Sequence, residues 1–114
     1  VMEVNGPDIS KYGVIKQNQS DNSVEGLIEK PLYAEAPSNL ASIGRYVLTP
    51  DIFNILRTQK VGSGGEIQLA DAINLHAVSG NVDLVYLNGM RFDCGSVQGY
   101  LDAIHHIADL DGKF

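Results

Sequence analysis

The sequence predicts an α/β domain, and two patterns carry that prediction. Short apolar segments separated by turns occupy the first part of the chain, which is typical of β-strands. Residues 66–79 and 97–110 instead carry apolar side chains at the spacing of an amphipathic helix. Strand-like and helix-like segments alternate toward the C-terminus, as they do in α/β folds. The 114 residues are enough for one domain with its own core.

The N-terminal part is expected to form strands joined by turns. The polar stretch KQNQSDNS at residues 16–23 separates two apolar segments, which is typical of a hairpin loop. The expected elements in order are a strand at residues 1–4, a turn at 5–8, strands at 12–15 and 24–28, and a loop at 33–39.

Glu29-Lys30-Pro31 follows the predicted strand at residues 24–28. A proline disfavours the helical conformation at the residue before it, so Lys30 is predicted to be extended. Glu29 and Lys30 then lie at the carboxyl end of a strand, where α/β sheets bind ligands. There a glutamate could accept sugar hydroxyls and a lysine could neutralise a phosphate. A solvated strand end would carry the same two residues, since both are common on surfaces.

The remaining chain alternates between the two kinds of element. Residues 40–48 (LASIGRYVL) are mostly apolar and predict a strand buried on both faces. Thr49-Pro50-Asp51 supplies an N-cap, a proline for the first helical position and an acid for the first turn, so a helix is expected as far as Arg57. The further expected elements are a flexible loop at 61–65, a helix at 66–79, a strand at 83–87, a turn at 88–89 and a helix at 97–110.

Composition excludes several classes of function. The net charge of −6 argues against broad nucleic-acid binding, which needs a basic surface, but a small phosphorylated ligand needs only one or two cations. No apolar run approaches the length of a membrane span, so no membrane partner is expected. Cys94 is the only cysteine, so no internal disulfide is possible and a reducing cytoplasm is expected. Residues 1–4 read like the inside of a strand, and the chain is expected to be part of a longer one.

Three further groups of residues have a structural and a chemical interpretation. The glycine-rich residues 61–65 lack the Gly-Lys-Ser/Thr ending of a phosphate loop, and Glu66 would repel a phosphate, so a flexible loop is favoured. Asp93 lies near a helix start, where the dipole favours an acid, but a carboxylate there could also ligate Mg²⁺. His105 and His106 diverge on a helix and cannot chelate one metal together.

A series of motifs runs in a characteristic order from about Asp8 to about Ala108. The segments are DISKYGV (8–14), EKP (29–31), PSNLA (37–41), GRYVL (44–48), EIQL (66–69), DAI (71–73) and DCG (93–95). Together they resemble the C-terminal half of bacterial UTP–glucose-1-phosphate uridylyltransferases, also called UDP-glucose pyrophosphorylases. The EKP motif alone is shared by many sugar-nucleotide transferases, whereas the later segments point to the uridylyltransferases.

The resemblance implies a fold, a reaction and a metal. The expected fold is part of a Rossmann-like nucleotide-diphospho-sugar transferase, a mixed sheet flanked by helices. The expected reaction is attack of the phosphate of glucose 1-phosphate on the α-phosphorus of UTP, which gives UDP-glucose and pyrophosphate. Such chemistry depends on positioning and on neutralisation of charge by Mg²⁺ and cations. Glucose 1-phosphate, UTP and UDP-glucose are the expected ligands. A homo-oligomer is expected on other grounds, because part of a longer chain exposes strand edges and apolar faces through which copies can associate.

The resemblance also implies roles for single residues. Glu29 is expected to accept hydrogen bonds from glucose hydroxyls, and Lys30 to be the catalytic cation on the sugar phosphate. Gly13 corresponds to a glycine whose backbone approaches the sugar, where a Cβ would crowd it. The expected substrate-binding residues are Gly13, Glu29, Lys30, Ser42 and Tyr46, and the expected Mg²⁺ ligand is Asp93.

Two departures from the family pattern limit what the chain can do alone. Ala70 stands where the family motif EIQLTDAI has threonine. The glycine-rich, basic nucleotide-binding signature and the main acidic Mg²⁺ ligand do not occur in the sequence. Residues 1–114 are therefore expected to be the C-terminal, sugar-phosphate-binding part of the domain, inactive without the nucleotide-binding half. Another sugar-nucleotide transferase, such as a thymidylyl- or adenylyltransferase, and a non-catalytic domain of the same fold remain alternatives.

Overall fold

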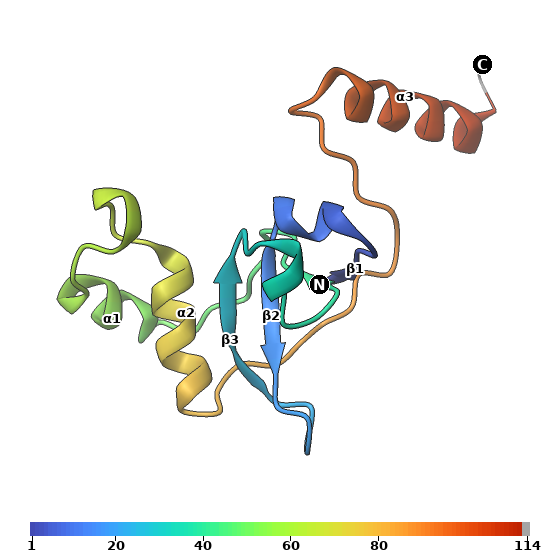
Figure 1. Cartoon of the computed structure of the whole chain (residues 1–114). Helices are drawn as coiled ribbons and strands as arrows, with labels where there is room; N and C mark the ends of the chain where they lie inside the picture. Colours follow the sequence, from blue (N-terminus) through green and yellow to red (C-terminus); the bar gives the residue numbers. More distant parts are fainter. Residues whose placement is uncertain (113–114) are drawn as a thin grey trace.

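A four-stranded sheet lies at the centre of the fold, with the helices at residues 52–58 and 69–78 on one side (Figure 1). The computed structural model describes residues 1–112, apart from the side chain of Ser63. The strands are β1 (Met2–Glu3), β2 (Gly13–Gln17), β3 (Val24–Glu29) and β4 (Leu40–Ala41), in the spatial order β1-β4-β2-β3. The helices are α1 (Ile52–Thr58), α2 (Leu69–Val78) and α3 (Val97–Asp111), with 3-10 turns η1 (Pro7–Lys11), η2 (Tyr33–Glu35) and η3 (Ser63–Gly65). The predicted α/β class is confirmed.

The hairpin of β2 and β3 is the longest pairing in the described sheet. Its register places Gly13 opposite Glu29 and Ile15 opposite Leu27. The polar loop closes through the Asn22 N–H, which donates to the Asn18 carbonyl at 2.9 Å. Every pairing in the described sheet is antiparallel, whereas the family resemblance implied a mixed sheet. Antiparallel neighbours need only a short turn between them, while parallel neighbours need a crossover.

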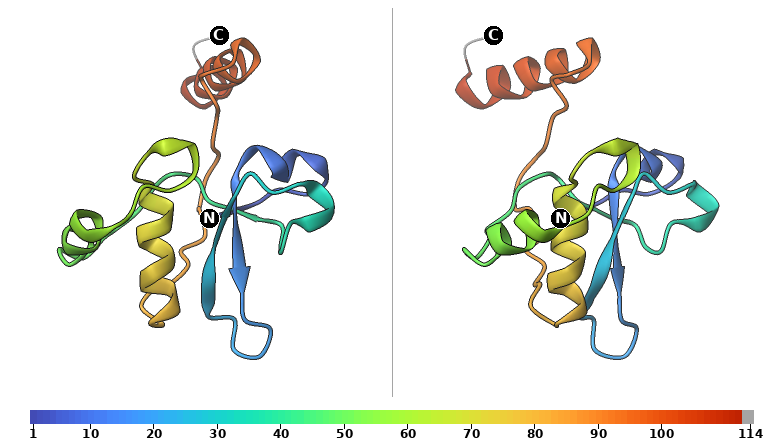
Figure 2. Two further views of the ribbon diagram at one scale, coloured as in Figure 1. Left: turned by 60° about the vertical axis from the view of Figure 1, so that its left-hand side comes forward. Right: turned by 90° about the vertical axis from the view of Figure 1, so that its left-hand side faces the viewer.

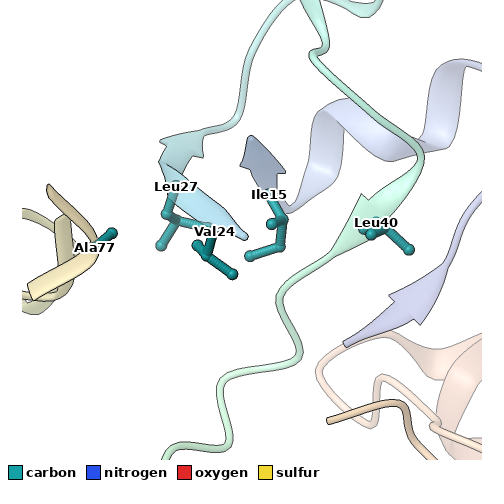
Figure 3. Close-up of a cluster of buried hydrophobic side chains, with 5 residues drawn as sticks. All are labelled: Ile15, Val24, Leu27, Leu40 and Ala77. Atoms are coloured by element: carbon teal, nitrogen blue, oxygen red, sulfur yellow. The ribbon is translucent and has the colours of Figure 1, made fainter. Parts of the chain in front are cut away.

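The larger core cluster lies between the sheet and α2. Alternation along β2 divides its side chains between two faces, so Ile15 and Val14 contribute to different clusters. The first cluster consists of Ile15, Val24, Leu27, Leu40 and Ala77 (Figure 3). The second consists of Ile9, Val14 and Ala41, so it joins η1 to the other face of the sheet.

Helix α2 covers the outer edge of β3 through one asparagine. The Asn74 Oδ1 atom accepts a hydrogen bond from the Leu27 N–H at 2.6 Å, and its Nδ2 donates to the Leu27 carbonyl at 3.0 Å. A Cβ on Gly26 would lie 3.1 Å from the same Oδ1 atom, so a glycine lets the amide approach. An unpaired strand edge exposes polar backbone groups, and here the Asn74 amide satisfies those of Leu27 in place of a further strand.

Asn74→Asp is therefore expected to lower the free energy of unfolding by about 1–3 kcal/mol, because a carboxylate cannot donate to the Leu27 carbonyl. Urea titration at neutral pH measures the change. Asn81→Asp adds the same charge at an exposed residue just after α2 and is the matched control. Equal unfolding midpoints for the two variants would contradict the role of Asn74.

The strand predicted at residues 40–48 is wrong beyond Ala41. β4 is only Leu40–Ala41, paired with β1 and with Val14, and the chain then leaves the sheet. Gly44 adopts a φ of 72°, and residues 44–50 are all exposed. An apolar run does not show whether a neighbouring strand is present to pair with it. Here β1 and β2 pair in register with Leu40 and Ala41 and with no later residue of the described segment.

The strand predicted at residues 83–87 is also absent from the described secondary structure. Its backbone hydrogen bonds in the described chain go to Val1: the Val1 amino group donates to the Val85 carbonyl at 2.7 Å, and the Leu87 N–H donates to the Val1 carbonyl at 2.8 Å. One residue is too short a partner for a ladder. The segment therefore has strand-like hydrogen bonds at Val85 and Leu87 without forming a strand.

Both shorter helices begin later than predicted. α1 starts at Ile52 with Asp51 as the N-cap residue, although the Ile52 N–H still donates to the Thr49 carbonyl at 3.1 Å. The Thr49 hydroxyl beside Asp51, with His76 as a weaker contributor, lowers the pKa of the Asp51 carboxyl. α2 starts at Leu69 rather than at Glu66, because the backbone before it is still extended.

Helix α3 matches the predicted span to within one residue and stands apart from the sheet (Figure 2). A long irregular connection leads to it from α2. Its large apolar side chains are exposed, namely Val97, Tyr100, Leu101, Ile104, Ile107 and Leu110. No helix in residues 1–112 combines the length and apolarity that a membrane crossing requires.

Candidate sugar-phosphate site

The end of the β2–β3 hairpin brings Gly13 and Glu29 together. The two residues are direct partners in the antiparallel register, so their side-chain positions share one face. A Cβ on Gly13 would lie 3.0 Å from the Glu29 Oε2 atom and 2.9 Å from the Leu27 Cδ1 atom. The Glu29 carboxylate therefore lies over the bare backbone of Gly13, and the missing side chain is what makes room for it.

Lys30 follows directly and has a left-handed backbone. Its φ is 44°, so the extended conformation predicted from Pro31 is wrong. The Lys30 N–H donates to the Tyr12 carbonyl at 3.1 Å, which continues the hydrogen-bond ladder past the end of β3. That hydrogen bond and the buried Pro31 hold the residue in a conformation that lysine seldom adopts. Such strain is typical of sites where a side chain must be aimed.

Ser42 and Tyr46 join the same end of the sheet from the segment after β4. The Ser42 N–H donates to the Gly13 carbonyl at 2.7 Å, and the Ser42 and Tyr46 hydroxyls lie 2.9 Å apart. The early departure of the chain from β4 is what allows this contact, because an extended strand would carry Tyr46 away. The structure thus gathers Gly13, Glu29, Lys30, Ser42 and Tyr46.

Asp93 lies just before α3 and is held there by the backbone of Gly95 and by the helix cap. Its Oδ1 atom accepts from the Gly95 N–H at 3.1 Å, and its carbonyl accepts from the Ser96 hydroxyl at 3.1 Å. Ser96 is the N-cap residue and accepts from the Gly99 N–H. The exposed Asp93 Oδ2 atom has no hydrogen-bond partner among residues 1–112. Among residues 1–112, no hydrogen bond or ion pair joins Asp93 directly to the other predicted site residues.

Sequence reasoning missed Gly99, although a glycine inside a helical pattern is a signal. A Cβ there would overlap the Asp93 carbonyl oxygen, so Gly99 lets the backbone of Asp93 lie against the helix. It also missed Arg91 and Tyr12, whose side chains contact each other. No spacing rule connects residues so far apart in the chain.

The remaining candidates keep structural roles. In the glycine-rich loop, a Cβ on Gly62 would lie 2.5 Å from the Asp71 Oδ2 atom, so a carboxylate that would repel a phosphate lies against the loop. The His76 Nε2 atom lies 3.3 Å from the Asp51 Oδ2 atom. Among the described residues, no cluster of three or more histidine, cysteine or acidic side chains could hold a metal ion by itself.

If the site binds a sugar phosphate, as the family resemblance implies, Gly13→Ala should raise the KM for it about tenfold. The same change should cost about 1–3 kcal/mol of stability, because the new Cβ displaces the side-chain ends of Glu29 and Leu27. Steady-state kinetics of the whole enzyme measures the effect. Gly26→Ala makes the same change in the same hairpin, against Asn74, and should cost stability without moving KM. An unchanged KM for Gly13→Ala would contradict the placement of Glu29.

Comparisons with known proteins show the family to which the chain belongs. A family model described as nucleotidyl transferase matches residues 1–109. The chain belongs to the nucleotidyl transferase family. Members of this family typically use a metal ion, and the exposed Asp93 carboxylate supplies oxygen atoms of the kind that a hard divalent cation prefers.

Several curated members of the nucleotidyl transferase family are similar to this chain. A UTP–glucose-1-phosphate uridylyltransferase of Pseudomonas aeruginosa is 47% identical over 106 residues, which cover 90% of this chain and 38% of that protein. The uridylyltransferase 1 of Staphylococcus saprophyticus is 45% identical over 105 residues, covering 89% of this chain and 36% of the relative. The chain thus spans less than two fifths of the length of these relatives.

Solved structures of the family extend the likeness to the fold. An apo UDP-glucose pyrophosphorylase superposes with a TM-score of 0.84 at 42% identity, covering 96% of this chain and 41% of that one. A UTP-bound enzyme from Acinetobacter baumannii gives a TM-score of 0.77 at 37% identity, covering 94% and 38% of the two chains. A further UDP-glucose pyrophosphorylase is complexed with UDP-glucose, with a TM-score of 0.76 at 42% identity over 95% of this chain and 42% of that one.

Proposed function

We propose that residues 1–114 form the sugar-phosphate side of a UTP–glucose-1-phosphate uridylyltransferase. The observation that carries this proposal is the Glu29 carboxylate lying over the side-chain-free backbone of Gly13, with Lys30 next in the chain. An acceptor for hydroxyls beside a cation for a phosphate suits the two ends of glucose 1-phosphate. The similarity to uridylyltransferases supports the choice of substrate.

In this proposal, the residues bind and orient the nucleophile. Gly13 leaves space for the Glu29 carboxylate beside the sugar ring, and Glu29 accepts hydrogen bonds from the hydroxyls of the ring. Lys30 neutralises the phosphate and holds it for attack on the α-phosphorus of UTP, so that charge developing during the transfer meets a fixed cation. Ser42 and Tyr46 line the sugar pocket through their paired hydroxyls.

Asp93 is the proposed ligand for Mg²⁺. A Mg²⁺ ion in such a site is bound by one or two carboxylates together with substrate phosphates, and it supplies neutralisation of the triphosphate charge. Asp93 offers one carboxylate oxygen for this purpose. A second carboxylate and the residues that hold UTP belong, in this proposal, to the rest of a domain of which residues 1–114 are the C-terminal part. The whole enzyme is proposed to be a cytoplasmic homo-oligomer.

The test is formation of UDP-glucose by the whole protein that contains this chain, compared with residues 1–114 alone. The whole protein is expected to convert UTP and glucose 1-phosphate in the presence of Mg²⁺, and residues 1–114 alone are expected to be inactive. The same assay with dTTP and ATP separates the uridylyltransferase from a thymidylyl- or adenylyltransferase. Preference for either nucleotide over UTP, or activity of residues 1–114 alone, would overturn the corresponding part of the proposal.

A further inference from the structure

Tyr12 is linked to Gly13 and to Lys30, two residues of the proposed site. It immediately precedes Gly13, and its carbonyl accepts the hydrogen bond that holds the left-handed backbone of Lys30. The Tyr12 N–H donates to the Ile9 carbonyl at 3.1 Å, and its ring packs against the cluster of Ile9 and Val14. A group that contacts the Tyr12 side chain is therefore fixed relative to the sugar-phosphate end of the sheet.

Arg91 makes that contact from the opposite end of the chain. Its guanidinium carbon lies 5.2 Å from the centre of the Tyr12 ring, and its Nη1 atom lies 3.4 Å from the Tyr12 hydroxyl oxygen. A guanidinium over an aromatic face is attracted electrostatically, more strongly where water is partly excluded. Both side chains are partly buried, so the contact is more than a surface encounter.

The next residue along the chain is tied to α3 instead of the sheet. The Phe92 ring lies 5.3 Å from the His106 ring, centre to centre. Residues 91 and 92 thus attach one connecting segment to two bodies, the sheet and α3. Asp93 follows at once, so its position relative to Lys30 depends on both attachments. The helix cap holds Asp93 at the start of α3, and the contact of Arg91 with Tyr12 ties the segment before it to the sheet.

We propose that Arg91, through its contact with Tyr12, is a positioning residue that sets Asp93 relative to Gly13 and Lys30. This inference rests on the proposed function. It assigns to two residues outside the predicted site the task of keeping the metal carboxylate in register with the sugar-phosphate residues. Arg91 itself need not touch the substrate, because the link runs through the Tyr12 ring.

The inference predicts a selective defect. In the whole enzyme, Arg91→Ala should raise the Mg²⁺ concentration for half-maximal activity at least fivefold and lower kcat about tenfold. The KM for glucose 1-phosphate should stay within twofold, because Glu29 and Lys30 keep their own hydrogen bonds. Arg91→Lys keeps a cation near the ring and should restore part of the loss. Arg57→Ala, which removes an exposed arginine on α1, is the matched control and should change neither constant.

A double-mutant cycle separates the contact from the charge of Arg91. Tyr12→Leu removes the ring without changing any charge and should reproduce the Mg²⁺ defect. The double variant should then be no worse than either single variant, as expected for two residues acting through one contact. Additive defects, or a KM for glucose 1-phosphate that rises as much as the Mg²⁺ requirement, would overturn the inference.

Amide hydrogen exchange provides a readout that needs no activity. Peptides covering residues 88–96 should exchange at least tenfold faster in Arg91→Ala than in the wild-type protein, while β2 and β3 are unchanged. Unchanged exchange would overturn the proposed link even in an active enzyme. If the wild-type protein forms no UDP-glucose, the proposed function fails, and the exchange experiment still decides whether Arg91 and Tyr12 hold the Asp93 segment.

Discussion

Lys30→Ala is expected to lower kcat/KM for glucose 1-phosphate roughly 30- to 1,000-fold, which corresponds to a loss of about 2–4 kcal/mol of transition-state stabilisation. The reason is that a closed site would lose its charge contact with the phosphate. Steady-state kinetics of the whole enzyme with saturating UTP and Mg²⁺ gives the value. Lys16→Ala removes a lysine from the same hairpin, where it pairs with Glu25 at 3.1 Å, and should leave kcat/KM unchanged. Similar rates for wild type and Lys30→Ala would contradict the role of Lys30.

Lys30→Gly distinguishes loss of the cation from loss of structure. The φ of 44° is strained for lysine and for alanine, whereas glycine adopts it without a steric penalty. Lys30→Gly should therefore unfold at the same urea concentration as wild type or a higher one, and yet lose as much activity as Lys30→Ala. A glycine variant that is both less stable and less active would mean that the backbone at this position is not under strain.

The parts of the fold that could be predicted are those in which the partner is close in sequence. The hairpin of β2 and β3 and the whole of α3 follow from a polar loop and from helical spacing, and both were predicted within a few residues. The segments at 40–48 and 83–87 are as apolar as the real strands. Their conformation depends on whether a distant strand is present to pair with them, and a local pattern does not contain that information.

The candidate site divides in the same way. The importance of Glu29 and Lys30 was inferred from a motif, and the register that places Gly13 under Glu29 follows from the hairpin. The left-handed backbone of Lys30 was missed, because the hydrogen bond to the Tyr12 carbonyl outweighs the usual preference of a residue before proline. The contact of Arg91 with Tyr12 spans 79 positions and belongs to an irregular segment, so nothing local predicts it.

Gly99→Ala should reverse the usual effect of this substitution in a helix. Alanine in place of glycine ordinarily stabilises a helix by about 1 kcal/mol. Here the new Cβ would overlap the Asp93 carbonyl oxygen and lie 2.8 Å from its carbonyl carbon, so the backbone of Asp93 must move. We expect a local destabilisation of about 1–3 kcal/mol, seen as faster amide exchange in residues 93–100.

The same change should lower kcat and raise the Mg²⁺ requirement of the whole enzyme, because Asp93 moves with its carbonyl while Glu29 and Lys30 stay in place. Gln98→Ala introduces alanine at the preceding, exposed position and should leave exchange in residues 93–97 and activity unchanged. Ser96→Ala removes only the cap, whose hydroxyl both accepts from the Gly99 N–H and donates to the Asp93 carbonyl. It should therefore cost about 1 kcal/mol and give a milder form of the same defect. If Gly99→Ala instead stabilised α3 and kept its Mg²⁺ requirement, the glycine would have no part in placing Asp93, and the turn that joins the two would be free to rearrange.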